Sequence, residues 1–150
     1  MVEMLPELTL TNDQAELAPL VAYAGKPLVL FFFPRASTPG CTKESIAFSE
    51  MLDAFGAADT AVAGVSKDSP KKLSNFREKQ GLTVDLLSDA DSDLSEQLGV
   101  WKEKQMYGKT FMGLERSTFL FDASGKLARE WRKVKVAGHA EEVLEAARAL

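Results

Sequence analysis

A chain of 150 residues with 45% apolar side chains can bury one hydrophobic core, so we expect a single domain spanning residues 1–150. Its 22 acidic and 18 basic residues are mixed along the chain and give a formal net charge of −4, which argues against a nucleic acid partner, because phosphate binding needs clustered Lys and Arg. No apolar stretch approaches the ~18 residues of a membrane helix, and "MVEMLPELTL" lacks the features of a secretion signal, so we expect a cytoplasmic protein that engages no membrane.

The first part of the chain predicts strands followed by a helix. Residues 8–11 and 16–20 are short strand candidates joined by the polar "TNDQ", which predicts an N-terminal β-hairpin. Residues 27–33, "PLVLFFF", form an unbroken apolar run that is too short for a typical helix, so we expect a central strand buried on both faces. Beyond the bend at residues 34–40, apolar residues fall at helical spacing as far as Gly56.

Strands and helices alternate through the rest of the chain. The patterns predict strands at residues 60–66, at 84–89 and twice within 116–131, and helices at residues 69–81, 91–100 and 139–150. Residues 99–113 fit neither pattern, and we expect an irregular stretch in which Trp101 and Tyr107 wall a pocket, the alternative being that they only fill a loop. The alternation predicts an α/β fold, with a central mixed β-sheet sandwiched by helices.

Cys41, the only cysteine, is a candidate nucleophile because it lies in the first turn of a predicted helix. Unpaired N–H groups and the helix dipole favour the thiolate there. Thr38 places a hydroxyl three residues upstream, and Pro34 and Pro39 stiffen the bend. A lone cysteine in a cytosolic domain is often an inert small hydrophobe, and the spacing alone leaves both possibilities open.

The segment "FFFPRASTPGCTKE" resembles the active-site segment of the peroxiredoxins, in which Pro, Thr or Ser, and Cys follow one another at fixed spacing. In this chain those residues are Pro34, Thr38 and Cys41. "TPGCTKE", "LPELTL" and "ERSTFLFDASGKL" are most similar to the bacterioferritin comigratory protein, or peroxiredoxin Q, branch of that family. The resemblance covers nearly the whole chain. It implies a thioredoxin-like fold and antioxidant reduction of hydrogen peroxide or organic hydroperoxides by a thiolate, without metal, haem or flavin.

The resemblance also implies roles for five residues. Cys41 would be the peroxidatic nucleophile that becomes a sulfenic acid, and Arg116 in "ERST" would stabilise its thiolate and orient the peroxide. Thr38 would hydrogen-bond the peroxide oxygens, and Pro34 would shield the site from water. Glu44 matches the acidic position of the motif. It either holds the arginine by a charge-assisted hydrogen bond or is a surface acid that complements the helix dipole.

The chain departs from the many members of this branch that carry a second, resolving cysteine on the same helix. Here that position is Ile46, so the sequence implies a one-cysteine mechanism and no internal disulfide. An external thiol reductant, such as thioredoxin, glutaredoxin or a low-molecular-weight thiol, or else a second subunit's Cys41, must then resolve the sulfenic acid. We expect a monomer.

Two other functions are compatible with the sequence. A thiol-based peroxide sensor would share the fold but would turn over poorly with a supplied reductant. A non-catalytic thioredoxin-like binding module would keep Cys41 buried and unreactive towards a small alkylating reagent. His139, which begins the last predicted helix, is expected to be a solvated cap and not a zinc ligand, because zinc sites need three or four ligands.

Overall fold

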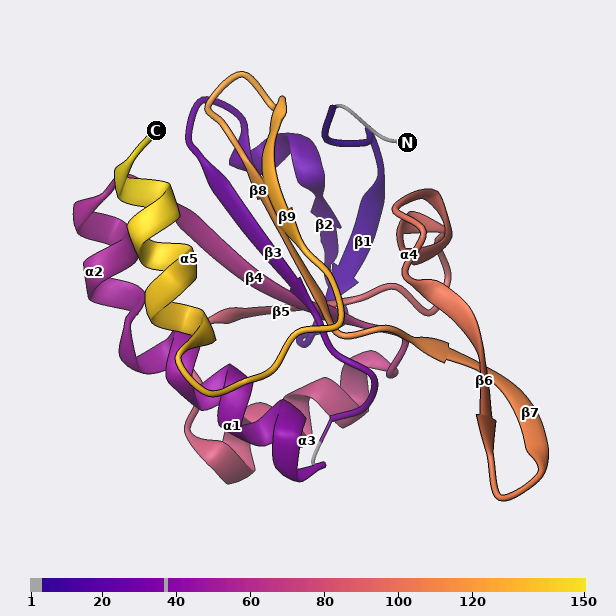
Figure 1. Ribbon diagram of the computed structural model, residues 1–150. Helices are drawn as coiled ribbons and strands as arrows, with labels where there is room; N and C mark the ends of the chain where they lie inside the picture. Colours follow the sequence, from indigo (N-terminus) through magenta and orange to yellow (C-terminus); the bar gives the residue numbers. More distant parts are fainter. Residues whose placement is uncertain (1–3, 37) are drawn as a thin grey trace.

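The computed structural model describes residues 4–36 and 38–150, which form a seven-stranded sheet in the order β2-β1-β5-β4-β3-β8-β9 and a two-stranded sheet, β6-β7 (Figure 1). The strands are β1 (Thr9–Asn12), β2 (Leu17–Pro19), β3 (Leu28–Phe32), β4 (Ala61–Ser66), β5 (Asp85–Ser88), β6 (Trp101–Met106), β7 (Lys109–Leu114), β8 (Ser117–Phe121) and β9 (Leu127–Trp131). The helices are α1 (Pro39–Glu50), α2 (Leu52–Ala57), α3 (Pro70–Gln80), α4 (Leu94–Gln97) and α5 (His139–Arg148), with a 3₁₀ helix, η1 (Leu20–Tyr23).

The central strand of the large sheet is β3, as its apolar run predicts. All five of its residues are buried, and it pairs in parallel with β4 and antiparallel with β8. The parallel trio β3, β4 and β5 together with the antiparallel strands makes the sheet mixed. The N-terminal hairpin is also confirmed, because β1 and β2 pair antiparallel.

Helices cover the two faces of the sheet unequally. Helices α1, α2, α3 and α5 pack on one face over a cluster that includes Phe31 and Phe48, whose rings stack at 4.5 Å (Figure 1). The other face is covered by α4, η1 and the N-terminal segment over a cluster that includes Phe32 and Phe119. No helix in the described part of the chain is long and apolar enough to cross a membrane.

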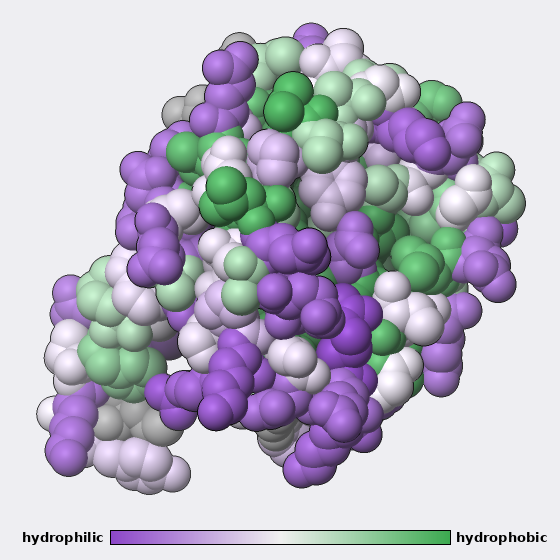
Figure 2. Space-filling model, turned by 180° about the vertical axis from the view of Figure 1, so that it is seen from behind, coloured by the Kyte–Doolittle hydropathy of each residue, from purple (hydrophilic) through white to green (hydrophobic). Residues whose placement is uncertain are grey.

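Three predicted elements differ from the structure. The helix predicted at residues 91–100 is only the short α4, Leu94–Gln97. The helix that begins at Cys41 does not run unbroken to Gly56, because the backbone leaves helical geometry at Met51 and α2 follows. Residues 99–113 are not irregular, since β6 and β7 pair in register as a hairpin that projects from the body (Figures 1 and 2). Its turn has positive φ at Tyr107 and Gly108, which is the geometry of a tight hairpin turn. The sequence has Tyr where such turns usually have Asn, so it lacks the Asn-Gly pattern that predicts a hairpin.

The expectation for His139 is wrong, because the side chain is buried and not solvated. Only 5% of it is exposed, and its Nε2 lies 2.8 Å from the hydroxyl of Thr118. Its ring meets the rings of Phe48 and Trp131 edge-on. Burial, aided by the positive charge of Arg116 and opposed by Glu142, lowers the pKa of His139 to about 4.

Acid is therefore expected to destabilise the protein through His139. Because its folded pKa lies below the ordinary value of 6.5, the unfolded chain binds the extra proton first, and stability present above pH 6.5 is lost as the pH falls towards 4. The loss attributable to this residue is at most about 3 kcal/mol. Urea unfolding of the wild type and His139→Gln, from pH 7.5 to pH 4, measures it as the change in their difference. Parallel pH curves would contradict the assignment.

Candidate active site

The thiol lies where the central strand gives way to a helix. Strand β3 ends at Phe32, the loop carries Pro34, and α1 begins at Pro39, so Cys41 is in the first turn of α1. Cys41 is a free cysteine with no exposed surface. N–H groups in the first turn of a helix lack partners within the helix, so they add positive potential at this sulfur.

Strand pairing brings a distant arginine to the same place. Strand β8 runs antiparallel to β3 with Ser117 opposite Phe32, so Arg116, which precedes β8, emerges beside the carboxyl end of β3. Its Nη2 donates to the sulfur of Cys41 at 3.2 Å, and its Nη1 donates to Oε1 of Glu44 at 2.7 Å. One guanidinium thus bridges two residues of α1 that are one turn apart.

Glu44 is a buried partner of the arginine and not a surface acid. Its side chain is 1% exposed, and Oε2 is buried with no hydrogen-bond partner among the described residues. Burial raises the pKa of Glu44 to about 7, against the opposing effect of Arg116. Oε1 of Glu44 takes one guanidinium nitrogen and the sulfur of Cys41 takes the other, so the two residues share Arg116.

Pro34 and Thr38 flank the approach to the thiol. Thr38 takes the N-cap position of α1 with an extended backbone, but its side chain makes no cap hydrogen bond. Its hydroxyl donates to the carbonyl of Arg35 at 2.9 Å, so the hydroxyl oxygen is left to accept a further bond. Pro34 is half-buried and contributes no backbone donor. Both residues line one cavity.

This cavity, of about 610 Å³, lies between the active-site loop and the β6–β7 hairpin. We call it the hairpin cavity. It is lined by Pro34, Arg35, Thr38, Lys67, Asp68, Trp101, Lys104, Phe111, Met112, Gly113 and Leu114. The expected aromatic wall is thus half right: Trp101 lines the cavity, whereas Tyr107 is 96% exposed at the hairpin tip.

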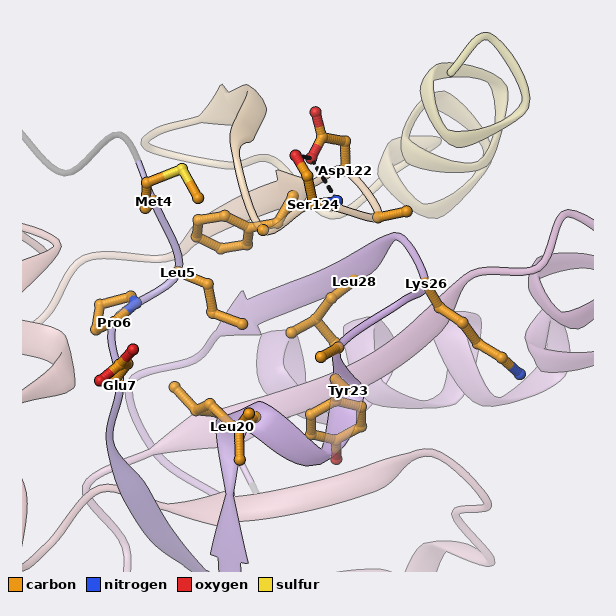
Figure 3. A pocket seen from close by; sticks show the side chains of 15 residues that line it. Met4, Leu5, Pro6, Glu7, Leu20, Tyr23, Lys26, Leu28, Asp122 and Ser124 are labelled. Atoms are coloured by element: carbon orange, nitrogen blue, oxygen red, sulfur yellow. Dashed lines mark hydrogen bonds between the residues drawn. The ribbon is translucent and has the colours of Figure 1, made fainter.

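A second, smaller cavity of about 210 Å³ lies at the opposite end of β3 (Figure 3). Leu5 and Leu20 point into it, and Leu28, the first residue of β3, closes it from the sheet. Cys41 follows the other end of β3, so this apolar cavity has no part in the chemistry of the thiol.

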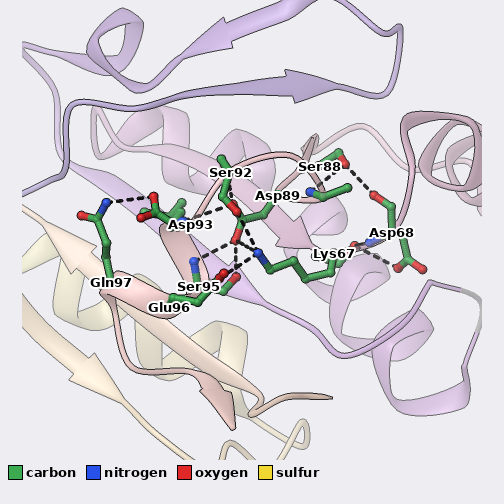
Figure 4. Close-up of polar contacts among 12 residues, drawn as sticks. Lys67, Asp68, Ser88, Asp89, Ser92, Asp93, Ser95, Glu96 and Gln97 are labelled. Carbon is green, nitrogen blue, oxygen red and sulfur yellow. Dashed lines mark hydrogen bonds and ion pairs between the residues drawn. The ribbon is translucent and has the colours of Figure 1, made fainter. Parts of the chain in front are cut away.

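Asp68 is a positioning residue that the sequence analysis missed. Its carboxylate accepts from the backbone N–H of Ala36 at 2.7 Å and from the hydroxyl of Ser66 at 2.9 Å, which ties the active-site loop to the end of β4. Its carbonyl accepts from the hydroxyl of Ser88 at 2.6 Å, where β5 ends (Figure 4). The available signal was an aspartate just after a buried strand, at the sheet edge where Cys41 also lies.

Gly40 allows the guanidinium to reach the sulfur. A Cβ on Gly40 would lie 3.0 Å from Nη2 of Arg116, which is tighter than ordinary van der Waals contact. Any larger residue would push this nitrogen away from Cys41. The glycine before the cysteine is therefore required by the side chain opposite it and not by a left-handed backbone.

Gly40→Ala is expected to slow oxidation of Cys41 by hydrogen peroxide by about tenfold, because it weakens one charge-assisted hydrogen bond without removing it. The substitution should not lower stability, since Ala favours a helix over Gly by up to ~1 kcal/mol. Stopped-flow oxidation and urea unfolding measure the two effects. Gly56→Ala in α2 is the matched control, because its Cβ meets nothing within 4 Å. Equal oxidation rates in both variants would show that Gly40 makes no room for Arg116.

Ile46 occupies the position of the absent second cysteine. It is partly buried against the apolar cluster beneath α1, so an aliphatic side chain fills this place. In the described part of the chain, no group of three or more His, Cys, Asp or Glu side chains is placed to hold a metal ion.

Comparison with known proteins agrees with this geometry. A family model described as AhpC/TSA matches residues 1–130. The chain is 46% identical over 140 residues to peroxiredoxin Bcp of Bacillus subtilis, covering 93% of this chain and 89% of that protein. It is 47% identical over 143 residues to peroxiredoxin Bcp of Xanthomonas campestris, covering 95% and 89%.

A solved structure of the Xanthomonas campestris bacterioferritin comigratory protein, described for its alkyl peroxide reduction activity, superposes with a TM-score of 0.91. The two sequences are 45% identical, and the match covers 99% of this chain and 97% of that one. The family match and the fold agree with a single thiol that is held beside an arginine. The chain belongs to the AhpC/TSA family and is a peroxiredoxin, a thiol peroxidase with the thioredoxin-like fold.

Proposed function

We propose that Cys41 is the peroxidatic residue and that its thiolate attacks the terminal oxygen of a hydroperoxide. The S–O bond forms as the O–O bond breaks, Cys41 becomes a sulfenic acid, and the leaving oxygen takes a proton to depart as water or an alcohol. The contact between Arg116 Nη2 and the sulfur, at 3.2 Å, carries this proposal. A cysteine that only fills space in a core would not require a charged donor, so the guanidinium indicates a reactive sulfur.

Each of the neighbouring residues has a separate role in the attack. Arg116 stabilises the thiolate and the negative charge that grows on the leaving oxygen, so it favours the transition state over the ground state. Glu44 accepts a hydrogen bond from Nη1 of Arg116 and so fixes the orientation of the guanidinium. Thr38 offers its hydroxyl to the peroxide oxygens, and Pro34 keeps water from the thiol.

Regeneration falls to an external thiol. The chain has no second cysteine, so the sulfenic acid forms a mixed disulfide with the reductant, and a second thiol then releases Cys41. Thioredoxin, glutaredoxin or a low-molecular-weight thiol could act in this way. We further propose that the chain works as one domain over residues 1–150, as a monomer and in the cytoplasm.

Steady-state consumption of hydrogen peroxide and cumene hydroperoxide with excess thiol reductant tests the proposal. We expect many turnovers per Cys41, which a peroxide sensor would not show, and no disulfide-linked dimer on non-reducing gels. Dimers that build up in step with turnover would instead assign resolution to a second subunit's Cys41. A native Cys41 that neither alkylates nor consumes peroxide would favour the binding-module alternative.

A further inference from the structure

The reducing thiol must reach a sulfur that has no exposed surface. Cys41 follows the loop whose Pro34 and Thr38 line the hairpin cavity, so a ligand in that cavity lies beside the loop that leads to the sulfur. The volume of this cavity, about 610 Å³, is within the usual range for a small-molecule site.

The hairpin cavity combines an apolar wall with positive charge. Trp101, Phe111 and Met112 supply the wall, and Phe111 and Met112 remain 39% and 49% exposed. Lys67, one of three basic residues in the lining, already pairs with Glu96 at 2.7 Å and Asp89 at 3.4 Å (Figure 4). Its charge is therefore neutralised within the protein.

The other two basic residues have no such partner. No carboxylate of the described residues forms an ion pair with Arg35 or Lys104, and the Lys104 amine donates only to the carbonyl of Leu114. Asp68, the one acid in the lining, accepts from Ala36 and Ser66 and keeps its negative charge, so it offsets only one of these two positive charges. The uncompensated charge of the cavity is thus positive, which suits an anionic ligand.

Lys104 also lies within electrostatic reach of the reacting groups. Burial, together with the positive charge of Arg116, lowers its pKa, and Cys41 and Glu115 oppose that effect. A ligand whose anionic end meets Lys104 is therefore held next to the loop that covers Cys41.

We propose that the hairpin cavity binds a small thiol that carries a carboxylate, of the class of cysteine-containing peptides, and directs its sulfur to oxidised Cys41. The carboxylate pairs with Lys104 and Arg35, and the aliphatic part lies on Trp101, Phe111 and Met112. The sulfenic acid and the thiol form a mixed disulfide and release water. A second thiol then attacks the sulfur of the small molecule, which leaves as its symmetric disulfide and frees the Cys41 thiolate. This inference rests on the proposed function.

The test compares two thiols that differ in charge, 3-mercaptopropionate and its methyl ester. Cys41 is first oxidised with one equivalent of hydrogen peroxide, and formation of the mixed disulfide is followed by quenched-flow mass spectrometry. Rates are compared at equal thiolate concentration. We expect the carboxylate thiol to react about tenfold faster than the ester, the effect of one charge-assisted contact.

Variants assign this preference to the cavity. Lys104→Gln and Arg35→Gln should each lower the ratio of the two rates, and a general effect on Cys41 cancels in that ratio. Lys109→Gln is the matched control, because Lys109 is exposed on the same hairpin and outside the cavity lining. It should keep the wild-type ratio.

Two results would overturn the inference. One is an equal rate ratio in the wild type, Lys104→Gln and Lys109→Gln. The other is a preference for charge that appears only in the oxidation step, when a carboxylate-bearing hydroperoxide is compared with a neutral one. The cavity would then bind the hydroperoxide and not the reducing thiol. Failure of the proposed function itself looks different, because no sulfenic acid would form before any thiol is added.

Discussion

Cys41→Ser is expected to lower hydroperoxide consumption by at least about a thousandfold, to the level of the reductant alone. The chain has no other thiol, and a serine hydroxyl is not ionised at neutral pH, so it cannot replace the attacking thiolate. A coupled assay with excess reductant measures the loss. Urea unfolding of the same variant shows whether the fold survives a hydroxyl at this buried position.

Ser45→Ala is the matched control for that loss. Ser45 is the buried neighbour of Glu44 on α1, and its hydroxyl has no hydrogen-bond partner among the described residues. The variant should therefore keep full peroxidase activity. Substantial activity in Cys41→Ser would contradict the assignment of the nucleophile, because the reaction would then have to use another group.

Arg116→Met should slow oxidation of Cys41 by about 10²–10³-fold, the usual effect of removing a donor aimed at developing negative charge. The sulfur loses its hydrogen bond at 3.2 Å and the positive charge beside it. Stopped-flow oxidation by hydrogen peroxide measures the rate constant directly. An unchanged rate would remove Arg116 from the mechanism.

Loss of Arg116 also leaves Glu44 buried without its partner. Because Arg116 lowers the pKa of Glu44, its removal should raise that pKa, and the variant should lose stability as the pH rises from the ordinary value of 4.5 through the raised folded pKa. The double variant Arg116→Met, Glu44→Gln removes the buried charge and separates catalysis from folding. It should be stable at alkaline pH yet still slow. Arg148→Met, on the exposed end of α5, is the control for loss of an arginine.

Much of the fold around the site was predictable because the signals are local. The apolar run before Pro34 marks a strand buried on both faces, whichever elements cover it. Local residues determine both ends of helix α3. The hydroxyl of Ser69 accepts from the N–H of Lys72 at its start, and Gly81 adopts a left-handed backbone at its end. The resemblance of the loop and of "ERST" to the peroxiredoxins then brought together the five residues proposed for the site.

The features that sequence patterns missed depend on tertiary packing. For Glu44 the sequence left both a contact with the arginine and a surface position open, and only the pairing of β8 with β3, which brings Arg116 over Glu44, decides for the buried contact. His139 begins a helix like a cap, but its place against Phe48 and Thr118 comes from how α5 packs on the sheet. Asp68 was missed for the same reason, since its partners come from two other segments.

We propose that the thiolate of Cys41, held by the guanidinium of Arg116, attacks peroxide. The single-turnover rate of Cys41 oxidation by micromolar hydrogen peroxide tests this claim, with intact-protein mass and a dimedone-type trap to identify the sulfenic acid. We predict the addition of one oxygen atom at Cys41, orders of magnitude faster than the oxidation of free cysteine. A rate no greater than that of free cysteine would contradict the claim.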